Sequence, residues 1–171
     1  MLFVKKRLRH LKRVKESWLK EKKMIKKILV PTDGSKGSEN AIQMAIEMAG
    51  NHEAELYIVY VVPKGEIPEK VVDYIKQERV DGGLGKLSTK VIGEAILEPV
   101  LKKVKSQGVK SVKWMVLRGD PAQEILKFAK SRQVDMIVMG KSGQGGIRGL
   151  LLGSISRKVC NLAECACVTV K

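Results

Sequence analysis

Short apolar segments alternate with amphipathic segments from residue 27 onward, and this alternation restricts the fold more than any other feature of the sequence. The apolar segments are residues 28–31, 56–62, 109–117, 134–139 and 165–170. Most of them are nearly continuous in apolar residues, which is typical of strands buried on both faces of a sheet. Strands separated by helices favour parallel pairing. The sequence therefore predicts an α/β domain whose parallel sheet is covered by helices on both faces.

Helical periodicity fills the intervals between these strands. The first predicted helix carries apolar residues at helical spacing, which are Ile42, Ala45, Ile46 and Ala49. Ser35 or Ser38 is the expected N-cap, and Gly50 is expected to end the helix. Residues 87–107 predict a second helix that bends at Pro99, because proline removes one backbone donor.

Two further helices complete the pattern. Asp120 followed by Pro121 predicts an N-cap and a proline in the first turn of a helix, and residues 154–162 predict the last helix. Sheets of this kind bind ligands beyond the carboxyl ends of their strands, where the strand order reverses. The loops at 31–35 and 140–153 are therefore the candidate binding segments.

The loop after the fourth predicted strand holds six glycines between residues 140 and 153. Glycines let backbone N–H groups approach an anion, and the N-terminus of the following helix adds unpaired donors and partial positive charge. Ser154 and Ser156 can add hydroxyl donors to phosphate oxygens, with Lys141 or Arg148 supplying charge. A purely structural interpretation stays open, in which the glycines make turns and Ser154 caps the helix.

Two well-known phosphate signatures do not match this loop. A P-loop requires Gly-Lys where this chain has Gly145-Gly146, and the dinucleotide fingerprint requires glycine where Arg148 stands. The spacing that does occur is Gly140, two residues, Gly143, nine residues, and then Gly153-Ser154.

This spacing after a short apolar strand, together with Val-Pro-Thr-Asp-Gly-Ser at 30–35, resembles the ATP-binding branch of the universal stress protein family. Gly-Asp-Pro-Ala-Gln-Glu-Ile at 119–125 is a further match, and the likeness runs from about Met24 to Lys171. The resemblance implies a Rossmann-like fold of the adenine nucleotide α-hydrolase type, a five-stranded parallel sheet of order 3-2-1-4-5. It also implies an adenine nucleotide at the switch point and a homodimer, commonly formed through the last strand.

The resemblance carries over to named positions. They are Pro31, Thr32, Asp33, Val61, Met139, Gly140, Ser142, Gly143, Gly153, Ser154, Ile155 and Ser156. By the family pattern, Asp33 hydrogen-bonds the ribose, Pro31 and Thr32 border the adenine, and Val61 contacts it. Met139 and Gly140 lie beneath the nucleotide, and residues 143 and 153–156 bind the phosphates of ATP. A Mg or Mn ion is held mainly by those phosphates, so no residue is assigned as a metal ligand.

Structural alternatives remain for two of these residues, and two positions depart from the family. Asp33 also suits a turn cap, and Val61 suits a core valine. Ser142 stands where many relatives have a larger basic or imidazole side chain, which leaves the phosphate contacts there undefined. Ala166 replaces the proline that usually precedes the last strand, so the dimer edge is expected to differ.

The candidate loops offer no histidine, no carboxylate pair and no Ser-His-Asp set. A hydrolase needs a positioned base for water, and the resemblance commits Asp33 to the sugar. No catalytic residue is therefore assigned. We expect ATP to act as a regulatory ligand in a stress response, with slow hydrolysis or none.

The first 24 residues form a separate basic arm, followed by the domain at 25–171. Residues 1–26 carry eleven lysines and arginines against two glutamates. Apolar residues fall within about a third of a helical turn, namely Val4, Leu8, Leu11, Val14 and Trp18. Such a helix can pack on its own domain, dock on a protein partner or lie on an anionic membrane surface, and a nucleic acid is the less favoured partner.

The arm also supports an alternative function, an adaptor at a membrane surface or nucleic acid in which the nucleotide fold is only a scaffold. Met24-Ile25-Lys26-Lys27 is similar to the usual start of the family, so a misassigned translation start is a further interpretation. The chain shows no apolar run of membrane-spanning length and no signal-peptide pattern, which predicts a cytoplasmic protein. Cys160, Cys165 and Cys167 are expected to be buried, reduced thiols.

Overall fold

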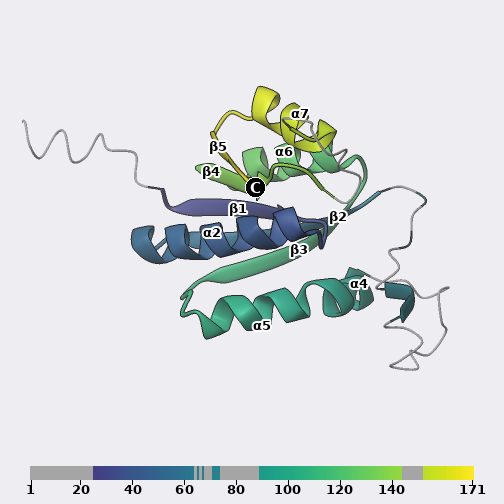
Figure 1. Ribbon diagram of the computed structural model, residues 1–171, viewed down its shortest axis with the longest axis horizontal. Helices are drawn as coiled ribbons and strands as arrows, with labels where there is room; N and C mark the ends of the chain where they lie inside the picture. The colour runs from purple at the N-terminus through teal and green to yellow at the C-terminus, as the bar shows by residue number, and fades with distance from the viewer. Residues whose placement is uncertain (1–24, 64, 66, 68–70, 74–88, 144–151) are drawn as a thin grey trace, which may run out of the picture.

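The computed structural model describes residues 25–63, 65, 67, 71–73, 89–143 and 152–171. Five parallel strands lie within them, β1 (Lys27–Thr32), β2 (Glu55–Val62), β3 (Val112–Arg118), β4 (Met136–Gly140) and β5 (Ala166–Val170). The strands pair in the order β3-β2-β1-β4-β5 (Figure 1). The predicted parallel sheet and its strand order are thus confirmed.

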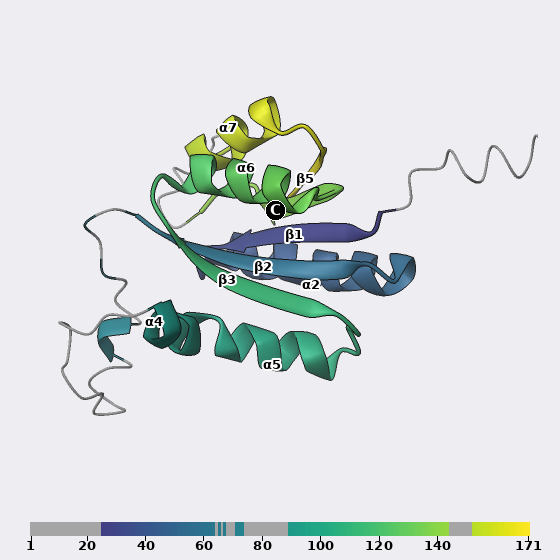
Figure 2. The same ribbon diagram turned by 180° about the vertical axis from the view of Figure 1, so that it is seen from behind.

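Helices cover both faces of the sheet. They are α2 (Lys36–His52), α4 (Thr89–Ile96), α5 (Glu98–Ser106), α6 (Pro121–Arg132) and α7 (Ser154–Leu162). The first three lie on one face, and α6 and α7 lie on the other, as the views from the front and from behind agree (Figures 1 and 2). The chain runs outward from β1 to β3 and then returns to β4 on the opposite side of β1. The strand order therefore reverses between β1 and β4.

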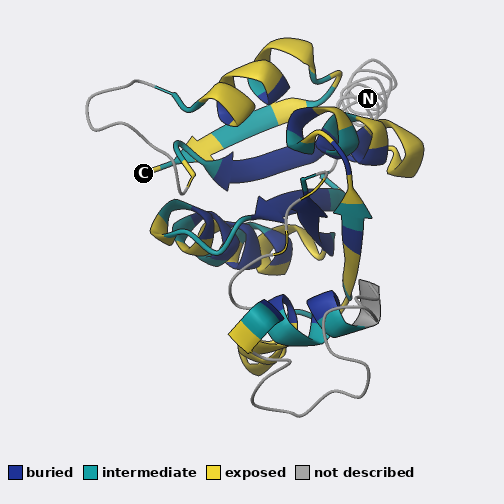
Figure 3. Cartoon of the chain, turned by 90° about the vertical axis from the view of Figure 1, so that its right-hand side faces the viewer, coloured by how far each residue is buried: buried dark blue, intermediate teal, exposed yellow. Residues whose placement is uncertain are grey.

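The central strands β1, β2 and β4 are buried on both sides, which explains their nearly continuous apolar sequence, whereas the edge strands β3 and β5 are partly exposed. Val30 and Ile58 belong to the cluster facing α2, α4 and α5, whereas Leu29, Val59 and Ile137 belong to the cluster facing α6 and α7. None of these five side chains retains any exposed surface. Figure 3 shows the burial concentrated in the sheet and on the inner sides of the helices.

The prediction that Gly50 ends the first helix is wrong. Helix α2 continues to His52, and Glu53 closes it in the left-handed conformation with φ of 51°. The backbone N–H of Glu53 donates back toward the carbonyls of Ala49 and Gly50. A non-glycine residue therefore takes the position that usually favours glycine.

The prediction of one bent helix over residues 87–107 is also wrong, because the chain breaks into α4 and α5 at Leu97. Pro99 lies in the first turn of α5, where a missing N–H leaves no helical hydrogen bond unmade. The proline thus begins a helix rather than bending one. The following strand is shorter than expected and begins at Val112.

Glu55, the first residue of β2, contacts side chains of β3, of its own strand and of the residue just before β3. Its carboxylate lies 2.6 Å from the Lys113 ammonium and accepts hydrogen bonds from the hydroxyls of Tyr57 and Ser111. The hydrogen bond from Lys113 is the largest influence lowering the pKa of Glu55, followed by that from Tyr57. The same carboxylate raises the pKa of Tyr57.

Because the pKa of Glu55 is lower in the folded protein, its carboxylate contributes its full stabilisation at pH values above the ordinary pKa of 4.5. This contribution is lost as the pH falls through the lowered pKa of the folded protein. Glu55→Gln should therefore reduce the free energy of unfolding at neutral pH by no more than about 1 kcal/mol, since Lys113 is largely solvated. Urea unfolding of both proteins should show the difference shrinking between about pH 6 and about pH 3. A difference that grows with acidity, or one matched by Glu47→Gln on the exposed side of α2, would refute this assignment.

Candidate functional site

Three segments meet beyond the carboxyl ends of β1 and β4: the turn after β1, the loop at 141–143 and the first turn of α7. A Cβ placed on Gly143 would overlap Oδ2 of Asp33, so the loop lies directly against this carboxylate. The backbone N–H of Gly153 donates to the carbonyl of Lys141 over 2.9 Å. The structure thus brings together the ends of the two candidate loops, at the point where the strand order reverses.

A hydroxyl network fixes the turn after β1. The Thr32 hydroxyl donates to Ser38 Oγ over 3.1 Å, and the Ser38 hydroxyl donates to the carbonyl of Ser35 over 2.8 Å. Ser35, not Ser38, is the N-cap of α2, because its Oγ accepts the N–H of Ser38. Thr32 is buried, and its hydroxyl supports the turn.

Asp33 has the turn-capping role that the sequence left open, and its contact with a ribose stays a prediction. Its Oδ1 accepts the backbone N–H of Ser35 over 3.0 Å, which is the expected turn cap. Its Oδ2 lies on the side of Gly143, toward the space between the two loops. Capping the turn therefore orients the carboxylate toward the candidate site.

Backbone meets backbone where β4 ends against the first turn of α2. A Cβ on Gly140 would lie 2.7 Å from the carbonyl carbon of Gly37 and 3.0 Å from the Ser38 nitrogen. A Cβ on Gly37 would lie 2.8 Å from the carbonyl oxygen of Ser142. Such distances exclude any side chain without movement of the backbone. The sequence analysis did not identify Gly37. The signal that could have indicated it is a glycine in the first turn of a helix, where most other residues favour the helix more than glycine does.

Among the residues that the structure describes, no side chain caps the first turn of α7. Gly153 is the N-cap residue and provides no side-chain acceptor, whereas Ser35 caps α2 and Asp120 caps α6. Ser154 and Ile155 are exposed on this turn. An uncapped helix N-terminus offers N–H donors and partial positive charge to an anion.

Ser156 takes a different position from the two residues before it. It is buried, and its hydroxyl donates to the carbonyl of Gly140 over 2.8 Å. This hydrogen bond joins the first turn of α7 to the end of β4. The hydroxyl proton of Ser156 is thus engaged in a hydrogen bond within the protein, and this bond orients α7 toward the site.

Apolar residues form the floor of the site. Val61 and Met139 belong to the cluster facing α6 and α7, and Pro31 is buried at the end of β1. Val61 therefore has the surroundings of a core valine at the end of β2. Lys141 and Ser142 are half-buried, and Arg148 lies outside the described residues.

The described residues contain no group of three or more histidine, cysteine, aspartate or glutamate side chains that could hold a metal ion. The three cysteines are free thiols, each half-buried rather than fully buried. Burial is the main cause that raises the pKa of Cys167 to about 12, with its two neighbouring cysteines adding to it. This thiol is therefore protonated, and a poor nucleophile, at neutral pH.

Known proteins resemble this chain in sequence and in fold. The sequence model of the universal stress protein family matches residues 24–171. Universal stress protein MJ0531 of Methanocaldococcus jannaschii is 35% identical over 156 residues, covering 86% of this chain and 83% of the relative. The solved structure of MJ0577 from the same organism is 27% identical, with a TM-score of 0.67, covering 86% of this chain and 96% of that one.

A solved complex of the universal stress protein from Archaeoglobus fulgidus with dAMP shares the fold, with a TM-score of 0.57 and 21% identity. The structural alignment covers 86% of this chain and 99% of that one.

Among the residues described here, no helix has the length and apolar character to span a membrane.

The contact between Gly140 and Gly37 predicts opposite effects for two glycine substitutions. Gly140→Ala should lower the free energy of unfolding by about 1 to 3 kcal/mol, because its Cβ meets backbone that cannot move aside without strain. Gly50→Ala, which has open space around it in α2, should raise it by about 0.5 to 1 kcal/mol. Thermal unfolding followed by circular dichroism measures both. Equal effects of the two substitutions would contradict the close packing.

Proposed function

The chain belongs to the universal stress protein family, and on that premise we propose that it binds an adenine nucleotide, ATP, beyond the carboxyl ends of β1 and β4. The observation that carries the proposal is the uncapped first turn of α7 beside Gly143 and Asp33. Donors and a carboxylate face one space there, which suits a ligand having both phosphates and a sugar. The dAMP complex of a relative with the same fold supports the choice of adenine.

Each part of the nucleotide has a matching group. The carboxylate of Asp33 accepts hydrogen bonds from the ribose, and the apolar floor of Pro31, Val61 and Met139 borders the adenine. The N–H groups of residues 143 and 153–155 bind the phosphates, with Ser142 and Ser154 as additional hydroxyl donors. Mg or Mn, when bound, neutralises phosphate charge and is coordinated mainly by phosphate oxygens. Gly140 and Ser156 keep the two walls of the site together.

We assign the nucleotide a regulatory rather than a catalytic role, in a cytoplasmic stress response with slow hydrolysis or none. Asp33 is engaged with the turn and directed toward the proposed ribose, so it is poorly placed to activate water. Binding would instead act on the 141–143 loop after β4. The backbone N–H of Lys141 donates to the carbonyl of Val170 over 2.6 Å, so this loop is joined to the end of β5.

Within the part of the chain that the structure describes, β5 is an edge strand that pairs with β4 alone, and its outer backbone groups can pair with another strand. We propose a homodimer formed through this edge. A nucleotide-dependent change at the 141–143 loop would then reach the dimer contact through the Lys141–Val170 hydrogen bond.

Substitutions that fill the space between the loops should weaken binding. Gly143→Val should lower ATP affinity at least tenfold, measured by titration calorimetry with Mg-ATP, because its side chain would displace the Asp33 carboxylate. Asp33→Asn keeps an acceptor for the turn and should weaken ATP and adenosine alike, since both contain the ribose. Gly50→Ala, on the far end of α2, should bind as the unaltered protein does. No heat from the unaltered protein at millimolar Mg-ATP would refute the proposal.

A further inference from the structure

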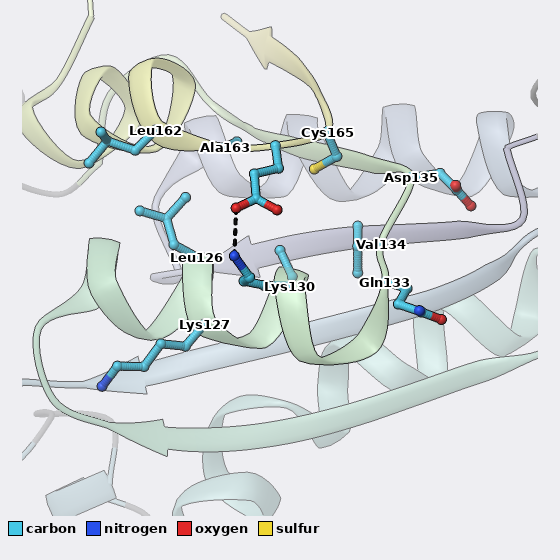
Figure 4. A pocket seen from close by; sticks show the side chains of 11 residues that line it. Leu126, Lys127, Lys130, Gln133, Val134, Asp135, Leu162, Ala163 and Cys165 are labelled. Carbon is cyan, nitrogen blue, oxygen red and sulfur yellow. Dashed lines mark hydrogen bonds and ion pairs between the residues drawn. The ribbon is translucent and has the colours of Figure 1, made fainter.

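A groove lies between the C-terminal half of α6 and the end of α7 with the residues that follow it (Figure 4). It is at the amino ends of the strands, whereas the proposed nucleotide site is at their carboxyl ends. It encloses about 490 Å³. Leu126, Val134, Ala163 and Cys165 contribute lining, and Leu162 stands at its wall with 59% of its surface exposed. Leu162 is the most exposed of the large apolar side chains in the described part of the chain. The groove thus has an apolar part that the proposed function leaves unused, and Lys127, Lys130, Gln133, Asp135 and Glu164 complete its lining.

The chain enters the domain beside this groove. The backbone N–H groups of Lys26 and Lys27 both donate to Oδ2 of Asp135, over 3.0 and 3.1 Å. Asp135 itself lines the groove, immediately before β4. The arm at residues 1–24 is therefore attached next to the groove wall.

Two features of this edge attract a cation, and they act beside Lys127 and Lys130, which also line the groove. Helices α6 and α7 both end here, and the free carbonyls at helix C-termini carry partial negative charge that attracts cations. Lys27, just after the arm, already uses this attraction, because its ammonium donates to the carbonyl of Arg132 over 2.8 Å. Glu164 adds a carboxylate at the groove, 2.7 Å from the ammonium of Lys130 (Figure 4). Both partners are largely exposed, so the carboxylate remains accessible to a second cation.

The arm has the length and pattern to occupy the groove. Its apolar positions run from Val4 to Trp18, a stretch of about 21 Å as a helix. Residues 19–24 can extend for about 20 Å, enough to lead the helix from Lys26 onto the α6 and α7 face. Lys15 falls on the same third of the helical wheel, which would bring a cation toward Glu164.

We propose that residues 4–18 pack as an amphipathic helix into the groove between α6 and α7. Leu8 and Leu11 then cover Leu126 and Leu162, and the lysines of the arm meet Glu164 and the carbonyls at the helix ends. The contact is a helix-in-groove interaction within one chain, separate from nucleotide binding. It withholds the apolar face of the arm from membranes and other proteins.

Photo-crosslinking in the full-length chain tests this placement. Leu11→p-benzoylphenylalanine should crosslink within one chain to peptides containing residues 126–135 or 162–165, as mass spectrometry identifies. Arg13→p-benzoylphenylalanine, on the opposite side of the helical wheel, should give at least fivefold less of these products. Equal yields from the two positions would overturn the proposal. So would products that form only between two chains.

A second pair of variants tests the groove itself in the Leu11→p-benzoylphenylalanine background. Leu162→Gln should lower the crosslink yield at least fivefold, and Met44→Gln, an exposed apolar residue on α2, should leave it unchanged. Both side chains are exposed, so neither change should prevent folding. Vesicles of phosphatidylserine provide the competing surface. Unchanged yield with Leu162→Gln, or capture of the arm by vesicles with complete loss of the crosslink, would assign the arm to another surface.

Discussion

Direct contact between the backbone of β4 and the first turn of α2 determines the geometry of the candidate site. A Cβ on Gly140 would collide with the backbone of Gly37, and a Cβ on Gly37 would collide with the carbonyl oxygen of Ser142. This contact places the 141–143 loop over the turn after β1, and the Ser156–Gly140 hydrogen bond then places the first turn of α7. The donors of α7 and the carboxylate of Asp33 consequently face one space. Without that approach, the two loops would be neighbours along the sheet edge but would not form one site.

The direction of the strands gives the two edges of the domain opposite character. In a parallel sheet with helical crossovers, helix N-termini gather at the carboxyl ends of the strands and helix C-termini at the amino ends. The carboxyl edge therefore favours anions, which suits a nucleotide, and the amino edge favours cations. At the amino edge, the ammonium of Lys27 donates a hydrogen bond to the carbonyl of Arg132 at the end of α6, which is an example of this preference. The basic arm joins the domain at that same edge, and the polarity of the fold supports its proposed docking there.

Much of the fold could be predicted from local sequence, because each strand carries its own apolar pattern and each crossover helix its own periodicity. The failures have local causes as well: Glu53 adopts a left-handed conformation that its residue type does not favour, and Pro99 begins a helix instead of bending one. The site residues came from spacing and family resemblance. Gly37 could not be found that way, because its importance comes from a strand far along the chain. The groove likewise joins segments that are separate in sequence.

The central claim is that backbone amides around residues 143 and 153–155, beside Asp33, hold the phosphates of an adenine nucleotide. Two-dimensional amide NMR of the full-length chain during a titration with Mg-ATP tests it most directly. The account predicts that the largest shifts fall on these amides, and that the amides of residues 126–135 at the opposite edge change little. Shifts centred on the α6 and α7 groove, or no shifts at residues 143 and 153–155 at millimolar nucleotide, would contradict it.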